Sequence, residues 1–180
     1  EWGRIYGASR TAVREAIKTL NGKGLLVSRP KVGSRVEPRE RWNLLDRDVM
    51  ACHRATLDER PFLLSTQEIR RILEPGAAVL AACRRSPAQL AALESALEHM
   101  RSEPDPEAKV AADVRFHLAL LAAANNELLV PFGIVIEQAL ASMFAYTTSH
   151  AAHPEQVLPL HEDVVKAIRR QSADAARRAM

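Results

Sequence analysis

Aromatic residues, cysteines and long apolar runs are all scarce in this chain of 180 residues. Aromatic side chains make up only 4% of it, whereas Ala and Leu abound, which favours helices over sheets. No apolar run approaches the roughly 18 residues that span a bilayer, and no signal peptide is visible, so we expect no membrane segment. The two cysteines, Cys52 and Cys83, lack the spacing of a zinc site or a disulfide framework, and we expect buried, reduced thiols in a cytoplasmic protein.

The charge is distributed unevenly along the chain. The whole chain has a formal net charge of +3. Residues 1–41 contain ten Lys or Arg and four Glu, which gives +6 (ten minus four), so the remainder carries about −3. The placement of the positive charge at one end, more than its total, indicates a DNA-binding segment there.

The N-terminal region predicts a helix followed by a small basic hairpin. Ser9 is a candidate N-cap, because its hydroxyl can accept one of the free amides that open a helix. An apolar stripe and a basic row follow on different faces, at Val13, Ile17 and Leu20 and at Arg10, Arg14 and Lys18. Gly24 predicts the helix end, and Gly33 the turn between two short strands at 25–28 and 35–37. This outline is typical of a winged helix-turn-helix domain, although the basic row alone also fits an ordinary solvated helix face.

These motifs resemble the DNA-binding domain of the GntR superfamily of bacterial transcription regulators. The likeness is carried by Ser9-Arg10-Thr11-Ala12-Val13-Arg14-Glu15-Ala16, Lys23-Gly24-Leu25-Leu26 and Arg29-Pro30-Lys31-Val32-Gly33-Ser34. The resemblance implies that Arg10, Arg14 and Gly33 contact operator DNA and that Thr11 contacts a phosphate. Ser9 and the helix N-terminus also suit phosphate, and Arg can bond O6 and N7 of guanine together. The resemblance to the GntR superfamily further implies that the first helix of this domain and part of its second precede Glu1.

The rest of the chain predicts a mostly α protein. We expect a truncated winged domain over residues 1–38, a linker over 39–45, and an all-α helical bundle of six or seven helices over 46–180. Helix start signals lie at Asp46, Ser65-Thr66-Gln67-Glu68, Ser86, Asp105, His153-Pro154 and Ser172. Pro61 is expected to end the helix that begins at Asp46, and Pro75 to kink or break the next one.

The C-terminal region resembles the FCD ligand-sensing domain of the FadR subfamily. The likeness is carried by Glu68-Ile69-Arg70-Arg71-Ile72-Leu73-Glu74-Pro75, Asp113-Val114-Arg115-Phe116-His117 and residues 160–168. It implies a divalent metal site formed by Asp113, His117 and His161, with a fourth ligand shortly after Met180. The spacing agrees, because residues four apart share one helix face. The same spacing also fits a simple surface pair of Asp113 and His117, with His161 as the cap of another helix.

The expected ligand set suits zinc, nickel, manganese or iron(II), and the sequence does not choose among them. Glu162 and Asp163 are candidates to support His161 from behind. The resemblance also implies an effector pocket, into which Arg70 would point to clamp a ligand carboxylate. An ion pair with Glu74 is the alternative for Arg70. Asn126 is a second candidate effector contact, although helix capping explains it equally well.

The main hypothesis is a homodimeric bacterial transcription regulator that binds two operator half-sites. A small organic acid, bound with the metal in the bundle, would control DNA binding, and its arrival would release DNA. Trp42-Asn43-Leu44-Leu45-Asp46 resembles regulators of sugar-acid catabolism, which suggests aldonates or uronates. The alternatives are a metal-responsive regulator and a metal-dependent hydrolase-like enzyme. The remaining histidines, His53, His99, His150 and His153, are not expected to bind metal.

Overall fold

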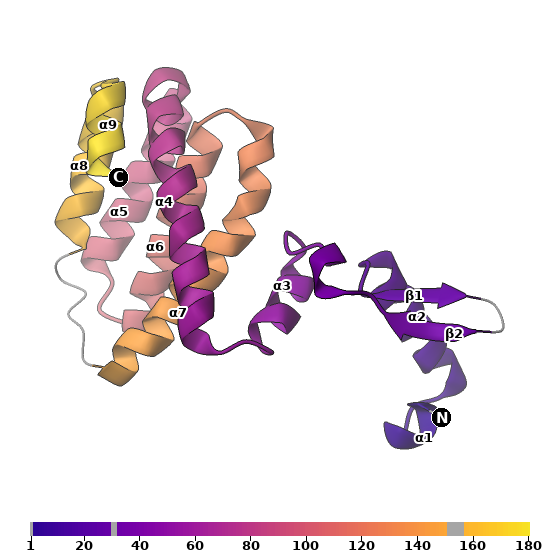
Figure 1. Ribbon diagram of the computed structural model, residues 1–180. Coiled ribbons are helices and arrows are strands. Elements are labelled where there is room, and N and C mark those ends of the chain that lie inside the picture. Colours follow the sequence, from indigo (N-terminus) through magenta and orange to yellow (C-terminus); the bar gives the residue numbers. More distant parts are fainter. Residues whose placement is uncertain (1, 30–31, 151–156) are drawn as a thin grey trace. The chain divides into compact units, whose positions relative to one another are not determined.

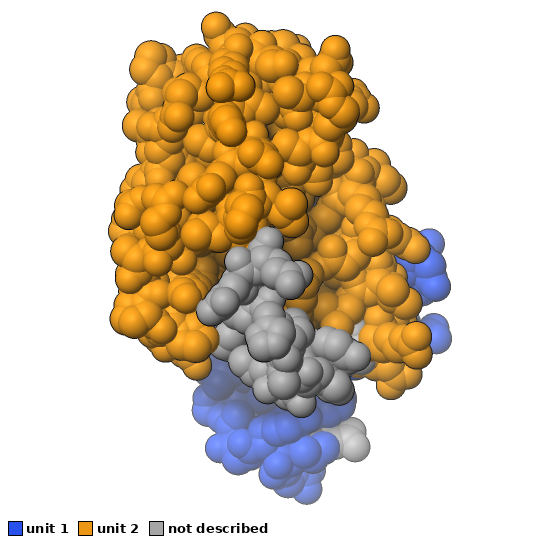
Figure 2. Space-filling view, turned by 90° about the vertical axis from the view of Figure 1, so that its left-hand side faces the viewer, with its two compact units in different colours: residues 1–56 blue, residues 57–180 orange. Residues whose placement is uncertain are grey.

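Helices dominate the structure, a computed structural model, as the composition predicts (Figure 1). It describes residues 2–29, 32–150 and 157–180, with the side chains of residue 59 and residues 144–150 left out. The chain divides into two compact units, residues 1–56 and 57–180, which are coloured separately in Figure 2. In the part of the chain that is described, no helix is long and apolar enough to cross a membrane.

The first unit contains a short helical region and one hairpin. Its elements are α1 (Trp2–Ile5), α2 (Arg10–Gly22), β1 (Leu26–Arg29), β2 (Gly33–Val36), the 3-10 helix η1 (Arg39–Arg41) and α3 (Arg47–Arg54). Ser9 caps α2, and its Oγ accepts the amide of Ala12 at 3.1 Å. Gly24 lies just beyond the helix with φ +74°, a conformation that glycine adopts without strain. The amides of Gly24 and Leu25 donate back to the carbonyls of Asn21 and Leu20, which closes α2 as predicted.

The hairpin follows directly. Strands β1 and β2 pair antiparallel, with Leu26 opposite Val36 and Arg29 opposite Gly33. Gly33 has φ +97°, so its place at the start of β2 requires a residue without a Cβ. Pro30 and Lys31 of the predicted turn lie outside the described residues.

Helix α3 belongs to the first unit. Asp46 caps it by accepting the amides of Asp48 and Val49 at 3.0 and 3.1 Å. The ammonium of Lys23, just beyond α2, lies 2.8 Å from Asp46 and 2.9 Å from Asp48. This ion pair lowers the pKa of Asp46 and raises that of Lys23. The division between units therefore falls after α3, whereas the sequence analysis placed it before this helix.

The second unit is an all-α bundle, as predicted. Its elements are α4 (Glu59–Arg84), α5 (Pro87–Ser102), α6 (Pro106–Ala123), the 3-10 helix η2 (Glu127–Phe132), α7 (Gly133–His150), α8 (Leu158–Arg169) and α9 (Ala173–Ala179). Helix α4 runs the length of the bundle and packs against α6, α7, α8 and α9 (Figure 1). The largest fully buried apolar side chains include Phe116, Leu93, Leu120, Leu121, Ile136 and Ile168.

Several helix starts are confirmed and one is wrong. Ser86 forms a capping box with Gln89, and Asp105 caps α6. Helix α4, in contrast, begins at Glu59, so Pro61 lies in its first turn, where a proline costs no hydrogen bond. Thr66, expected at the helix start, donates instead to the carbonyl of Leu63 inside the helix. The helix also continues through Pro75, so the predicted break does not occur.

Cys52 and Cys83 are both exposed, so the prediction of buried thiols is wrong. The apolar residues just before them are buried instead: Val49 and Met50 on α3, and Ala81 and Ala82 on α4. The helix start predicted at His153 falls outside the described residues, and the next described helix, α8, begins at Leu158.

Candidate metal centre and nucleic-acid interface

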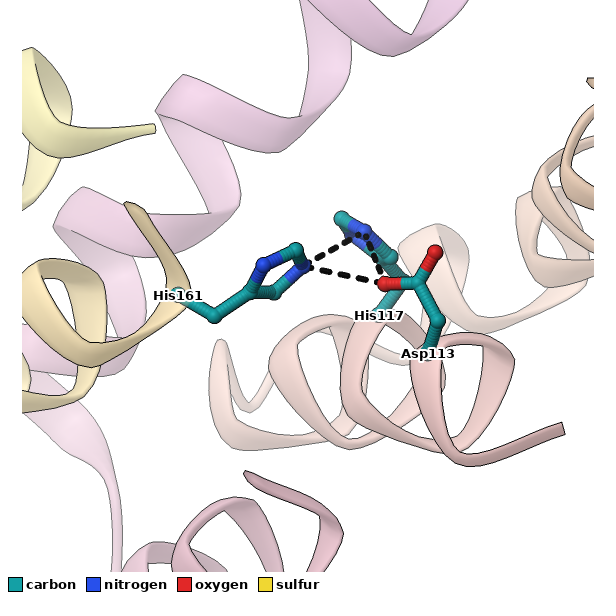
Figure 3. Close-up of side chains that lie close together, drawn as sticks. All are labelled: Asp113, His117 and His161. Carbon is teal, nitrogen blue, oxygen red and sulfur yellow. Dashed lines mark hydrogen bonds and ion pairs between the residues drawn. The ribbon is translucent and has the colours of Figure 1, made fainter. Parts of the chain in front are cut away.

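Three predicted metal ligands meet inside the second unit. Asp113 and His117 project from adjacent turns of α6, and His161 faces them from α8 (Figure 3). Asp113 Oδ1 lies 3.0 Å from His161 Nε2 and 3.4 Å from His117 Nε2, and the two Nε2 atoms are 3.4 Å apart. Helices α6 and α8 both pack against α4 and α5, and this arrangement brings together residues 44 positions apart in sequence.

These separations suit three ligands of one ion. With metal–ligand distances of about 2.1 Å, neighbouring ligand atoms lie about 3.0 Å apart at right angles and about 3.4 Å apart at tetrahedral angles. The three observed distances span that interval. One carboxylate oxygen and two imidazole nitrogens are also a donor set that divalent transition metals accept.

The cluster is buried and highly polar. His117 is 2% exposed and His161 7%, and Asp113 Oδ1 is shielded from solvent without accepting a hydrogen bond from any described residue. Burial alone would raise the pKa of Asp113, but the two imidazoles outweigh it and hold that pKa below its ordinary value. Burial alone would lower the pKa of His117, but Asp113 and Glu74 outweigh it and raise that pKa. A buried carboxylate oxygen that faces two imidazole nitrogens at 3.0 and 3.4 Å is a position that a cation would stabilise.

Arg70 and Glu74 complete the cluster from α4. Arg70 Nε donates to Glu74 Oε1 at 2.8 Å, and Arg70 Nη2 lies 2.9 Å from His117 Nε2. Glu74 is only 3% exposed, and its Oε1 lies 3.2 Å from His117 Nδ1. Arg70 therefore forms the ion pair with Glu74 that was the alternative for it, and its guanidinium also lies beside His117. Its contact with an effector stays a prediction. The sequence analysis missed Glu74 as a site residue, although its position four residues after Arg70 was the available signal.

His161 is oriented by the backbone. Its Nδ1 lies 2.9 Å from the carbonyl of Val157, which leaves Nε2 facing Asp113. Glu162 instead pairs with Arg101 at 2.7 Å, and Asp163 lies 4.0 Å from the ammonium of Lys166. The Val157 carbonyl thus orients His161, a role that was expected of Glu162 and Asp163.

The remaining candidates lie apart from the cluster. Asn126 Oδ1 accepts the amide of Leu128 at 3.1 Å, so its described contact is a cap on η2. Among the histidines not expected to bind metal, His99 Nδ1 lies 2.7 Å from the carbonyl of Ser95, and the ring of His53 packs edge-on against Trp42. The side chains of His150 and His153 are outside the described part of the chain.

The predicted DNA contacts are exposed in the first unit. Arg10, Thr11 and Arg14 lie in the first two turns of α2, next to the Ser9 cap. Gly33, at the start of β2, is also exposed. An exposed helix N-terminus with two arginines, followed by a basic hairpin, presents donors suited to phosphates and base edges.

Comparisons with known proteins identify the family. Residues 66–180 match the FCD domain. The chain is 36% identical over 177 residues to the galactonate operon transcriptional repressor of Escherichia coli (strain K12), an alignment that covers 97% of this chain and 77% of the repressor. It is 38% identical over 125 residues to the HTH-type transcriptional regulator LutR of Bacillus subtilis (strain 168), covering 69% of this chain and 55% of LutR.

Solved structures show the same fold. The chain matches a GntR protein of Streptococcus agalactiae with a TM-score of 0.62 at 24% identity, covering 98% of this chain and 80% of that one. It matches Lar of Listeria monocytogenes with a TM-score of 0.64 at 19% identity, covering 98% and 77%. The relatives by sequence are transcription regulators and not enzymes, so the hydrolase-like alternative is wrong. The chain therefore belongs to the GntR family of transcriptional regulators, with a C-terminal FCD domain.

Proposed function

We propose that a small organic acid, bound beside a divalent metal ion in the helical bundle, controls how this regulator binds its operator. The observation that carries the proposal is the buried cluster of Asp113, His117 and His161, with the Arg70 guanidinium 2.9 Å from His117 Nε2. A buried site with three metal ligands and an adjacent guanidinium suits an anionic ligand that can also bind metal.

The first unit would recognise the operator. Arg10 and Arg14 would reach base edges in the major groove, and each guanidinium can bond O6 and N7 of a guanine. Ser9 and Thr11 would contact phosphates at the helix N-terminus, and Gly33 would let the hairpin backbone approach DNA closely. A homodimer would place two such surfaces on half-sites about one helical turn apart.

The second unit would hold the metal and the acid. Asp113, His117 and His161 would be the protein ligands of zinc, nickel, manganese or iron(II), and the ion would supply positive charge for a carboxylate or hydroxyl oxygen. Arg70 would bind the acid's carboxylate through the edge of its guanidinium that Glu74 does not occupy. Glu74 and the Val157 carbonyl would orient the two imidazoles.

The relatives suggest the class of acid and the direction of control. The name of the Escherichia coli relative describes a repressor of a galactonate operon, which agrees with the sugar acid expected from the sequence. We therefore infer that an aldonate or uronate is the effector and that its binding releases DNA. Such a ligand changes the equilibrium only by its different affinity for the two protein states.

The test compares Asp113→Asn with Asp163→Asn, a matched control at an exposed position of α8. We expect Asp113→Asn to lose bound metal on dialysis and to lose the response of operator binding to galactonate, while operator binding itself persists. The control should behave like the unchanged protein. Retention of one metal ion per chain by Asp113→Asn would contradict the assigned site. A response of operator affinity to the metal alone, without any acid, would instead establish the metal-responsive alternative.

A further inference from the structure

Outside Asp113, His117 and His161, four buried side-chain atoms have no hydrogen-bond partner among the described residues. His53 Nδ1 belongs to the first unit and Arg85 Nε lies at the C-terminal end of α4, whereas the other two lie within the bundle. They are the hydroxyl of Ser142 on α7 and the amide nitrogen Nε2 of Gln67 on α4. Ser142 is 1% exposed. A serine inside a helix ordinarily bonds the carbonyl of the preceding turn, but Ser142 Oγ makes no such bond. Buried polar groups that lack partners are rare, and each such group requires an explanation.

Gln67 lies on the face of α4 that carries Arg70 and Glu74. The three residues are three and four positions apart, so they share one stripe of the helix. Asn125, just after α6, donates to the carbonyl of Arg84 at 2.7 Å, and Glu74 lies beside His117. These contacts pair residues 41 and 43 (117 minus 74) positions apart, so α4 and α6 run parallel in a fixed register. The same offsets place Gln67 level with residues 108–110 of α6.

Ser142 reaches the same level from α7. Gly133, at the start of α7, lies against Leu118 so closely that a Cβ there would stand 2.5 Å from Leu118 Cδ2. Helix α7 returns along α6 in the opposite direction (Figure 1). Nine positions after Gly133 (142 minus 133), Ser142 is therefore level with residue 109, and it lies on the buried stripe of Val135 and Ala139.

The two groups thus lie at one level, about four residues before Asp113 along α6. Four residues of helix correspond to roughly 6 Å. Helix α7 packs against both α4 and α6, the two helices that carry Arg70, Glu74, Asp113 and His117. A ligand held at Arg70 and the metal ligands would extend toward this level.

We propose that Gln67 and Ser142 bind a hydroxyl group of the effector that is remote from its carboxylate, so the bundle prefers a long polyhydroxy acid to a short 2-hydroxy acid. This inference rests on the proposed function, because it assumes that the carboxylate end binds at Arg70. An alcohol can accept from the Gln67 amide and donate to Ser142 Oγ, which satisfies both groups. With carbon–carbon bonds of about 1.5 Å, a six-carbon aldonate is long enough to cover one helical turn, whereas lactate is not.

The experiment measures the Kd of galactonate and of lactate for the full, zinc-loaded chain by calorimetry. The variants are Ser142→Ala and Gln67→Leu. The matched control is Thr66→Val, because the Thr66 hydroxyl is also buried but already donates to the Leu63 carbonyl. We expect galactonate to bind about three- to tenfold more weakly to each variant, the loss of one hydrogen bond, while lactate affinity stays unchanged. The control should preserve the ratio of the two affinities.

Thermal unfolding of the metal-loaded protein without acid separates a binding role from a structural one. Removing a hydroxyl that has no partner should leave the Tm of Ser142→Ala unchanged or raise it. A lower Tm with an unchanged affinity ratio would show that the hydroxyl holds an ordered water and would overturn the inference. Equal weakening of both acids would also overturn it. If the unchanged protein binds neither acid, the proposed function itself fails. If it binds both acids but neither substitution changes the ratio of galactonate to lactate affinity, only this inference fails.

Discussion

Arg70 and Glu74 form a pair that is common on helices but rarely so deeply buried. The side chains are 11% and 4% exposed, and both also lie against His117. Burial alone would raise the pKa of Glu74, but His117 and Arg70 outweigh it and hold that pKa below its ordinary value. Glu74 therefore stays ionised in the interior, where its charge is matched by two neighbouring groups.

Replacing Glu74 should consequently destabilise the bundle. We expect Glu74→Ala to lower the free energy of unfolding by about 3–5 kcal/mol, because it leaves a buried guanidinium without its partner. Urea denaturation followed by circular dichroism would measure this change. The comparison is Glu98→Ala, which breaks an exposed pair with Arg101 on α5 and should have no measurable effect. Similar destabilisation by both substitutions would contradict the role assigned to burial.

Arg14 provides a residue-scale test of the DNA surface. We expect Arg14→Ala to weaken operator binding by about 1–3 kcal/mol and to relax base preference at one position of each half-site. Fluorescence anisotropy with the operator and with single-base variants would measure both effects. Arg71→Ala removes the same charge from an exposed position of α4 and is the control. An unchanged operator affinity for Arg14→Ala would mean that another side chain reads the base.

The candidate metal and effector site was only partly predictable from the sequence. Asp113 and His117 follow from a local rule, because a spacing of four places both on one helix face, and the family resemblance added His161. No local rule finds Gln67 or Ser142, because their significance lies in burial, and burial depends on how α4, α6 and α7 pack. For the same reason the sequence could not decide whether Arg70 pairs with Glu74 or reaches the site.

At the scale of elements, α3 is held to the end of α2 by charge. Asp46 both caps α3 and pairs with Lys23. Because the pKa of Asp46 is lowered in the folded state, its contribution to stability is present above the ordinary carboxyl pKa and is lost as the pH falls through the lowered value. Because the pKa of Lys23 is raised, its contribution is present below the ordinary lysine pKa and is lost as the pH rises through the raised value.

Asp46→Asn tests this attachment, because asparagine caps a helix about as well as aspartate but carries no charge. We expect the variant to unfold at a lower temperature than the unchanged protein at neutral pH, and the difference to shrink in acid. Tryptophan fluorescence reports on the first unit alone, since Trp2 and Trp42 both belong to it. Asp105→Asn, which changes the cap of α6, is the control. A difference that is independent of pH would mean that the ion pair does not stabilise α3.

The element boundaries show where local signals compete. The pattern Ser65-Thr66-Gln67-Glu68 fits a capping box, yet Glu59 already begins α4 and Thr66 bonds within it. Pro61 reads as a stop signal but is equally suited to a first turn. Packing against four other helices of the bundle is sufficient to keep α4 helical through Pro75. Signals at Ser86 and Asp105 had no such competitor, and both predictions are confirmed.

At the scale of the whole molecule, the two units must influence each other if the acid controls DNA binding. We expect galactonate to weaken operator affinity, and the operator to weaken galactonate affinity by the same factor, about 5- to 150-fold. Titrating each ligand in the absence and presence of the other, by anisotropy and calorimetry, measures both factors. Asp113→Asn should reduce the factor to one. A factor of one in the unchanged protein would show that the bundle binds acids without regulating DNA binding.

The fixed register of α4 and α6 has a consequence for how such regulators diverge. Successive positions on the inner stripe of α4, such as Leu63 and Gln67, differ in height by one turn of roughly 5–6 Å. Exchanging a polar and an apolar residue between them would move the contact point by one such step while leaving Asp113, His117 and His161 in place. If Gln67 binds the acid as proposed, point substitutions of this kind would change the preferred length of the acid in discrete steps. Related regulators would then acquire different effectors while Asp113, His117 and His161 stay unchanged.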